Sequence, residues 1–122
     1  MAPHPQRITV HRVRGFDLQA TSQRLNGRPA KMVTRPGRWG NPFEVAEVMA
    51  RFDVDREAAQ ARAVALCRQW LDGTLDPELD PGKKPPSRER IITELAGYNL
   101  ACWCRPGEPC HADHLIELAN PK

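Results

Sequence analysis

Three of the four cysteines and one of the four histidines lie within ten residues near the C-terminus. Cys102 and Cys104 stand in the segment Leu-Ala-Cys-Trp-Cys, and Cys110 and His111 follow a short Arg-Pro-Gly-Glu-Pro loop. Side chains alternate between the two faces of a strand, so we expect both Cys102 and Cys104 on one face. We expect Cys110 and His111 in the first turn of a following helix. The spacing therefore predicts four chemically active side chains near one end of a strand.

The first interpretation of this cluster is a metal site. Three thiols and an imidazole form a Cys₃His set, which suits tetrahedral zinc. Cys102, Cys104, Cys110 and His111 are therefore candidate zinc ligands. Neighbouring helical residues project about 100° apart, so Cys110 and His111 reach one ion only if the first helical turn is irregular. Paired Cys-x-x-Cys motifs, which are common in zinc sites, are absent from the sequence.

The second interpretation needs no metal. Cys110 would stand at a helix N-terminus, where unpaired N–H groups and the helix dipole lower the pKa of a thiol. His111, Asp113 or His114 would then act as a base or as an orienting group. Cys110, His111 and Asp113 are therefore candidate catalytic residues. The same N–H groups would also bind a phosphate or a carboxylate.

The third interpretation is structural. Cysteine is among the most frequently buried residue types, so these cysteines would belong to the core and His111 would form a hydrogen bond. Cys67 lies in the apolar stripe of a predicted helix, and we interpret it as a small buried hydrophobic residue. The sequence leaves all three interpretations of the C-terminal cluster open.

A second segment with binding groups reads Arg-Pro-Gly-Arg-Trp-Gly-Asn-Pro-Phe. Its arginines, Arg35 and Arg38, present planar guanidinium groups that match phosphate. Trp39 offers a stacking surface for a base, and Asn41 offers an amide that pairs with the edge of a purine. These four residues are candidate ligand-binding residues. In the alternative, Trp39 and Phe43 anchor a long loop to the core, and Asn41 forms a turn that caps the next helix.

Alternating strand and helix signals position these two segments. Strands are expected at 7–13, 30–34 and 99–104, and longer helices at 56–72, 87–95 and 110–119. A short helix is expected after residue 42, and residues 14–29 are expected to form a loop with room for a short turn of helix. Asp55 is the expected N-cap of the longest helix, and Gly73 its expected end. This order predicts an α/β fold: a small single-layer sheet of about three to four strands packed by three to four helices, with long Pro-rich loops.

The bulk composition narrows the class of protein. A chain of 122 residues suits a single domain, residues 1–122, and 40% hydrophobic with 27% charged residues is typical of soluble globular proteins. No run of about 18 apolar residues exists, so no membrane partner is expected, and the N-terminal residues lack the apolar core of a secretory signal. We therefore expect a cytoplasmic protein, in which cysteine clusters are more often metal-binding or catalytic than disulfide-bonded. The net charge of +3 is compatible with a phosphate-bearing partner.

Three short motifs together resemble the signature of the uncharacterised domain-of-unknown-function family 4326, found in bacteria and their phages. They are Arg38–Phe43, Leu100–Cys104 and Cys110–Asp113, and their order, spacing and the chain length agree with the family. Where the family commonly has glycine after the Cys-His pair, this chain has Ala112. The resemblance implies no established activity and no established cofactor.

These observations predict that the loop 35–41 and the Cys–His cluster share one pocket for a nucleotide or a nucleic-acid base. If the protein is an enzyme, cleavage or transfer at a nucleoside bond is the expected reaction class. A zinc deaminase is disfavoured, because His-x-Glu and Pro-Cys-x-x-Cys are missing. The alternative is a non-enzymatic module that is stabilised by zinc and binds nucleic acid or a protein. The sequence does not decide between them and does not indicate an oligomeric state.

Overall fold

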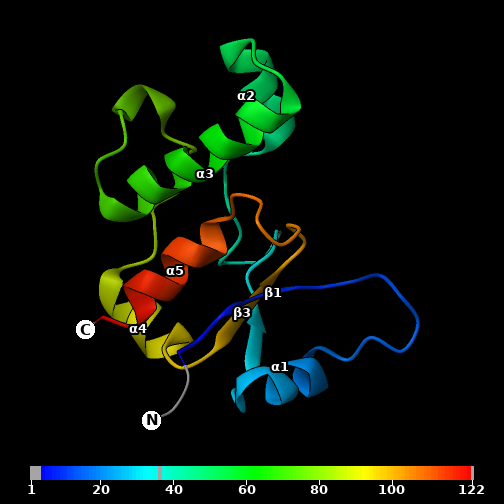
Figure 1. Cartoon of the computed structure of the whole chain (residues 1–122). Helices are drawn as coiled ribbons and strands as arrows, with labels where there is room; N and C mark the ends of the chain where they lie inside the picture. Colours follow the sequence, from blue (N-terminus) through cyan, green and yellow to red (C-terminus); the bar gives the residue numbers. More distant parts are fainter. Residues whose placement is uncertain (1–3, 36, 122) are drawn as a thin grey trace.

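The computed structural model describes residues 4–35 and 37–121 (Figure 1). Three short parallel strands form one sheet in the order β1-β3-β2: β1 (Arg7–Thr9), β2 (Ala30–Met32) and β3 (Asn99–Cys102). The helices are α1 (Leu18–Asn26), α2 (Val45–Phe52), α3 (Arg56–Asp72), α4 (Arg88–Leu95) and α5 (His111–Ala119), with a 3-10 turn η1 (Pro77–Leu79).

The predicted α/β class is confirmed, with three strands in the sheet as expected. The described residues contain five α-helices, one more than the upper expected number, because α1 occupies a segment that was predicted to be a loop. None of these helices combines the length and the apolar character that a bilayer crossing requires.

The central strand β3 pairs in parallel with both of its neighbours. All four of its residues are buried, as expected for the middle strand of a parallel sheet that is covered on both faces. The strands end earlier than the sequence predicted. Beyond them, only single hydrogen bonds continue the pairing, from Val10 N to Cys102 O and from Val33 N to Ala101 O.

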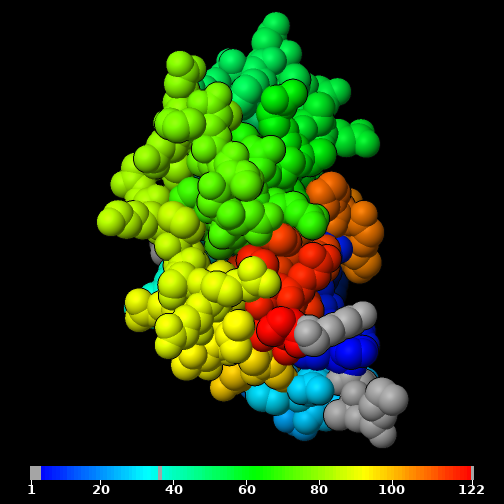
Figure 2. Space-filling view, turned by 90° about the vertical axis from the view of Figure 1, so that its left-hand side faces the viewer, coloured from blue at the N-terminus to red at the C-terminus, as the bar shows by residue number. Residues whose placement is uncertain are grey.

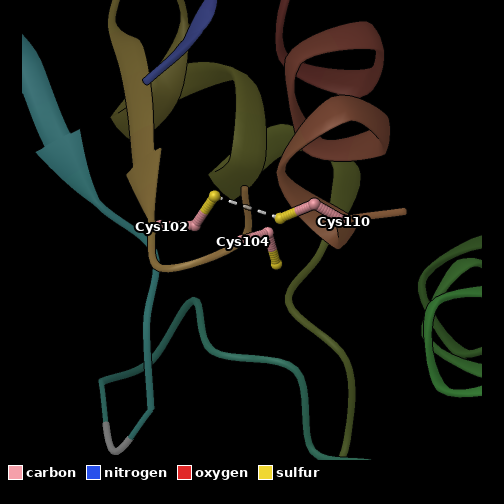
Figure 3. A group of neighbouring side chains, drawn as sticks. All are labelled: Cys102, Cys104 and Cys110. Atoms are coloured by element: carbon pink, nitrogen blue, oxygen red, sulfur yellow. Dashed lines mark hydrogen bonds between the residues drawn. The ribbon is translucent and has the colours of Figure 1, made fainter. Parts of the chain in front are cut away.

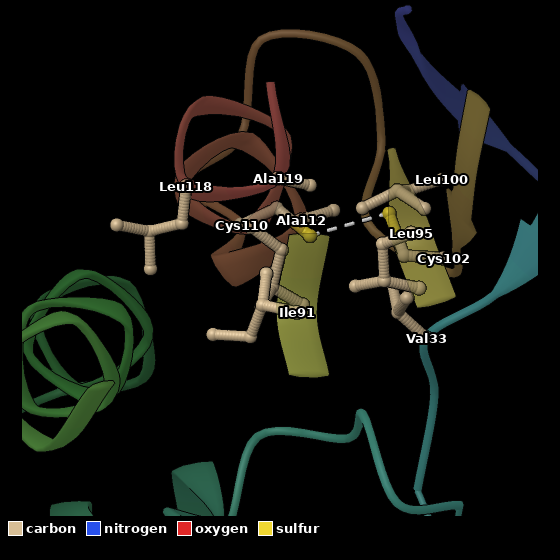
Figure 4. Close-up of a cluster of buried hydrophobic side chains, with 10 residues drawn as sticks. Val33, Ile91, Leu95, Leu100, Cys102, Cys110, Ala112, Leu118 and Ala119 are labelled. Carbon is tan, nitrogen blue, oxygen red and sulfur yellow. Dashed lines mark hydrogen bonds between the residues drawn. The ribbon is translucent and has the colours of Figure 1, made fainter. Parts of the chain in front are cut away.

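Side-chain alternation along β3 divides the core into two layers. Leu100 and Cys102 face Val33 and the buried sides of α4 and α5, as Figure 4 shows. Ala101 faces the opposite side of the sheet, where it packs with Ile8 and the first residue of α1. The sheet is thus a thin middle layer, with α4 and α5 on one face and α1 on the other.

The longest helix, α3, has the predicted bounds. The side chain of Asp55 accepts a backbone hydrogen bond at its N-terminus, and Gly73 ends it with a positive φ of 78°. Its apolar stripe packs on α2 in a cluster that includes Cys67, which is 1% exposed, as predicted. Burial raises the pKa of Cys67 to about 12. Leu71 contacts both this cluster and the one under α5, so α3 is connected to the sheet layer.

Helix α1 forms without an apolar stripe. Ser22 is its one fully buried residue, and the helix is bounded by local signals instead. The side chain of Asp17 accepts a hydrogen bond from the first helical turn, and Gly27 ends the helix with a φ of 75°. The prediction of a loop over 14–29 was therefore wrong for the greater part of this segment.

Asn99, the first residue of β3, is fully buried and joins three segments. Its Oδ1 accepts hydrogen bonds from Gln6 N at 2.9 Å and from Asn26 Nδ2 at 2.8 Å. Its Nδ2 donates to Ser22 Oγ at 2.7 Å and to Asn26 Oδ1 at 2.8 Å. Polar side chains thus hold α1 against the amino end of the sheet, where apolar contacts are few.

We expect Asn99→Ala to lower the free energy of unfolding by about 3 kcal/mol, because several buried polar groups lose their partners. Denaturant titration of the variant and of the wild type measures this difference. Gln69→Ala, on the exposed face of α3, serves as the control and should stay within about 0.5 kcal/mol of the wild type. Equal effects of the two substitutions would contradict the role assigned to Asn99.

Candidate metal centre

Three thiols meet at the carboxyl end of β3 (Figure 3). Cys102 is the last residue of β3, Cys104 lies two residues beyond it, and Cys110 is the N-cap of α5. Their sulfur atoms all lie within 4.8 Å of one another, and the Sγ atoms of Cys102 and Cys110 are 3.2 Å apart. Sulfur ligands of one tetrahedral zinc ion lie about 3.8 Å apart when each Zn–S distance is about 2.3 Å. The three sulfurs therefore have a spacing that small side-chain movements would fit to a single ion.

A tight turn between β3 and α5 brings these sulfurs together. Within it, Arg105 N donates to Glu108 Oε1 at 2.7 Å, and Glu108 N donates to Arg105 O at 3.0 Å. Gly107 has a φ of 85°, which is readily available to glycine. Thr9 Oγ1 donates to Cys104 O at 2.7 Å and fixes the backbone before the turn. The turn lies at the molecular surface beside α3, in orange in Figure 2.

Arg7 of β1 connects this turn to α5. Its Nη1 donates to Glu108 O at 2.8 Å and to Asp113 Oδ2 at 2.9 Å, and its Nη2 donates to Arg105 O at 3.2 Å. The side chain of Arg7 is 12% exposed, whereas that of Asp113 is 59% exposed, so the ion pair itself lies at the surface. The sequence alone did not indicate Arg7, since an arginine in a short strand belongs to no motif. The predicted catalytic residue Asp113 is held in this ion pair, and its catalytic role stays a prediction.

The ring of His111 is buried and fixed by two backbone carbonyls. Its Nε2 lies 2.8 Å from Val33 O and 2.9 Å from Trp39 O. Because carbonyl oxygens only accept, Nε2 carries the proton and Nδ1 keeps its lone pair. That Nδ1 lies 3.9 Å from Cys110 Sγ. Desolvation lowers the pKa of His111, so the ring is neutral near pH 7.

This arrangement suits His111 as a fourth ligand. Metal-bound histidines usually donate their other ring N–H to a carbonyl or a carboxylate, as Nε2 does here. The backbone of Cys110 is extended, with φ −152° and ψ 137°, so Cys110 and His111 are not two successive helical residues. The expected separation of about 100° between their side chains is thereby avoided. His111 does not belong to the group of mutually close sulfurs, so it would have to approach them to share an ion.

The three thiols differ in their acidity. Hydrogen bonds from Cys102 and Cys110 lower the pKa of Cys104 to about 3, and the nearby charge of Arg7 acts in the same direction. Donation to Cys104 raises the pKa of Cys102 to about 11, and donation together with burial raises the pKa of Cys110 as well. Hydrogen bonding among the three thiols therefore favours Cys104 over Cys110 as the more acidic thiol, and a catalytic role for Cys110 stays a prediction.

The segment from Arg35 to Phe43, here called the Arg–Trp loop, packs against the same end of the sheet. Trp39 lies against the cluster of buried residues under α5, and its carbonyl accepts the proton of His111. Arg38 is exposed and its Nη1 lies 3.3 Å from both carboxylate oxygens of Glu94. The cavity between this loop and His111 has a volume of about 10 Å³. That volume is about enough for one water molecule.

Arg35 and Asn41 bond to the protein's own backbone. Arg35 Nη1 donates to Asn41 O at 2.9 Å. Asn41 Nδ2 donates to Ala63 O at 3.1 Å, and its Oδ1 accepts from Phe43 N at 2.8 Å. At Gly40, a Cβ would lie 2.7 Å from Arg35 N, so the loop requires glycine there. These contacts agree with the anchoring alternative, and the ligand-binding roles of Arg35, Arg38, Trp39 and Asn41 stay predictions.

Comparison with known proteins supports the motif resemblance. Residues 16–121 match the model of a family described as a domain of unknown function, DUF4326. The matched segment contains the three thiols, His111 and the Arg–Trp loop, and it begins after β1. Searches of curated proteins and of solved structures give no match.

We expect Arg7→Ala to lower the free energy of unfolding by about 2–3 kcal/mol, because three acceptors lose a shielded donor. Amide hydrogen exchange should become faster over residues 105–113, which Arg7 holds. Arg88→Ala, at an exposed position of α4, is the control and should leave exchange in that segment unchanged. Unaltered exchange in Arg7→Ala would show that the turn keeps its shape without this side chain.

Proposed function

The chain belongs to the domain-of-unknown-function family DUF4326, and because that description includes no activity, we propose a function from the site itself. The protein is a non-enzymatic module that is stabilised by one zinc ion and binds nucleic acid. The observation that carries the zinc proposal is the convergence of three sulfurs within 4.8 Å at the turn between β3 and α5.

The donor set supports zinc in a structural role. Thiolates and imidazole are the ligands that zinc prefers, and structural zinc sites have four protein ligands. Cys102, Cys104 and Cys110 supply three of them, and Nδ1 of His111 is the nearest available fourth donor. Bound zinc would join the end of β3 to the start of α5 and close the turn of residues 103–109. Zinc would thereby replace the S–H hydrogen bonds that connect the sulfurs without metal.

The cavities favour a module over an enzyme. An active site for a small molecule is usually a cleft of several hundred Å³. The space beside His111 is about 10 Å³. Larger cavities of about 520 Å³ and about 190 Å³ lie at the loop around η1 and at α2, and none of the three thiols lines them. A nucleic acid would therefore bind to the surface near the thiols, and not in a pocket between the two motifs.

Charge and thiol chemistry support the partner and the compartment. A net charge of +3 favours association with a polyanion. We place the protein in the cytoplasm, because that compartment keeps neighbouring cysteines such as these reduced.

We expect the purified protein to contain one equivalent of zinc, and its removal by a chelator to lower Tm by about 10 °C or more. Native mass spectrometry measures the metal content, and thermal denaturation measures the stability. Cys104→Ser should weaken zinc binding at least tenfold, because the ion loses one of its three thiolate ligands. Cys67→Ala is the matched control, since Cys67 lies in the α2–α3 core, and it should bind zinc as the wild type does.

A zinc-free protein with an unchanged Tm in chelator would contradict the zinc proposal. In that case, rapid alkylation of one cysteine near neutral pH would favour the enzyme interpretation instead.

A further inference from the structure

A tryptophan stands on the surface directly beside the thiol cluster. Trp103 lies between Cys102 and Cys104 in the chain, and it is 47% exposed. Trp103 and Cys104 stand in the bend that directly follows β3. The other tryptophans are placed differently: Trp39 packs against the core and Trp70 is 6% exposed. Packing therefore accounts for Trp39 and Trp70 but leaves much of the Trp103 ring in water.

Arg12 lies over this ring, with its Cζ atom 4.7 Å from the ring centroid. Arg12 follows β1 and Trp103 follows β3, and these strands are parallel neighbours with Thr9 opposite Cys102. Both segments consequently leave the same end of the sheet (Figure 1). The cation–π contact holds the ring in one orientation, which reduces the entropy that a ligand would have to remove.

Three exposed arginines lie in the two segments that follow β1 and β3 at this end of the sheet. Arg12, Arg14 and Arg105 are exposed, and within the described parts of the chain none of them forms an ion pair. Each of these two segments also contains a carboxylate, which a backbone N–H group holds in place. Asp17 accepts a hydrogen bond from the first turn of α1, and Glu108 accepts one from the backbone of Arg105.

We infer that Trp103, Arg12, Arg14 and Arg105 form a binding site for single-stranded nucleic acid, an inference that rests on the nucleic-acid partner proposed above. An exposed indole stacks with an unpaired base, whatever its sequence, and unpaired guanidinium groups bind the adjacent phosphates. A duplex conceals the faces of its bases inside the stack, so it would use the arginines but not the ring. This asymmetry favours a single strand over a duplex.

The test is fluorescence anisotropy of a labelled oligodeoxythymidylate about 20 nucleotides long, with the zinc-supplied 122-residue chain at low salt. We expect the wild type to bind this single strand more tightly than a duplex of equal length. Trp103→Ala should weaken binding at least tenfold, and Trp103→Phe should retain more of the affinity because phenylalanine still stacks. Arg14→Ala should reduce the salt dependence by about one phosphate contact. Arg88→Ala on α4 is the control and should bind as the wild type does.

The outcomes separate this site from the broader proposal. Tight binding by Trp103→Ala would overturn the site and leave nucleic-acid binding standing. If the wild type binds neither the single strand nor the duplex, the Trp103 site and nucleic-acid binding are both overturned. Capture of a protein through Trp103 in place of nucleic acid would overturn both as well. Unaltered zinc content and circular dichroism show that the variants fold. If Trp103→Ala does not fold, unchanged affinity in both Arg14→Ala and Arg105→Ala overturns the site.

Discussion

The parallel pairing of β3 with strands on both of its sides is the constraint on which the rest of the structure depends. It brings the carboxyl ends of β1 and β3 to one edge, and the short turn after β3 returns the N-terminus of α5 to the same place. Three sulfurs, a buried imidazole and an exposed indole gather there because the backbone leaves the sheet at that edge. At the opposite edge, Asn99 holds the amino end of β3 to α1. The carboxyl end of β3 thus carries the thiol cluster, and its amino end carries the hydrogen bonds that hold α1.

The cysteine cluster combines two properties that are usually separate. Its sulfurs are close enough to form hydrogen bonds with one another, which lowers the pKa of Cys104. Its histidine is neutral and has a defined tautomer, because Val33 and Trp39 accept its Nε2 proton. The three sulfurs and Nδ1 of His111 are therefore already oriented to bind a cation in place of the thiol protons. The Arg–Trp loop contributes to this centre through a backbone carbonyl, so its fixed geometry matters for the cluster even where its side chains bond elsewhere.

The sequence contained enough information for the class of fold and the bounds of α3, because both depend on local periodicity, but it left open whether the three thiols meet. It did not reveal α1, whose polar composition hides the helical period; the caps Asp17 and Gly27 were the available signals. It did not reveal Arg7 either, since its partners lie about a hundred residues away and follow from the strand order. The size of the space beside His111 depends on side-chain packing, which no spacing rule describes.

The position of β3 in the chain has a consequence for synthesis. The central strand β3 is the last of the three to leave the ribosome, so β1 and β2 emerge before the strand with which both of them pair. During that interval the nascent chain exposes the apolar side chains of two unpaired strands, a condition that favours association with chaperones. The compact α2–α3 pair relies on contacts close in sequence and is free to form meanwhile. Completion of the sheet is therefore a late, cooperative event in the biogenesis of this protein.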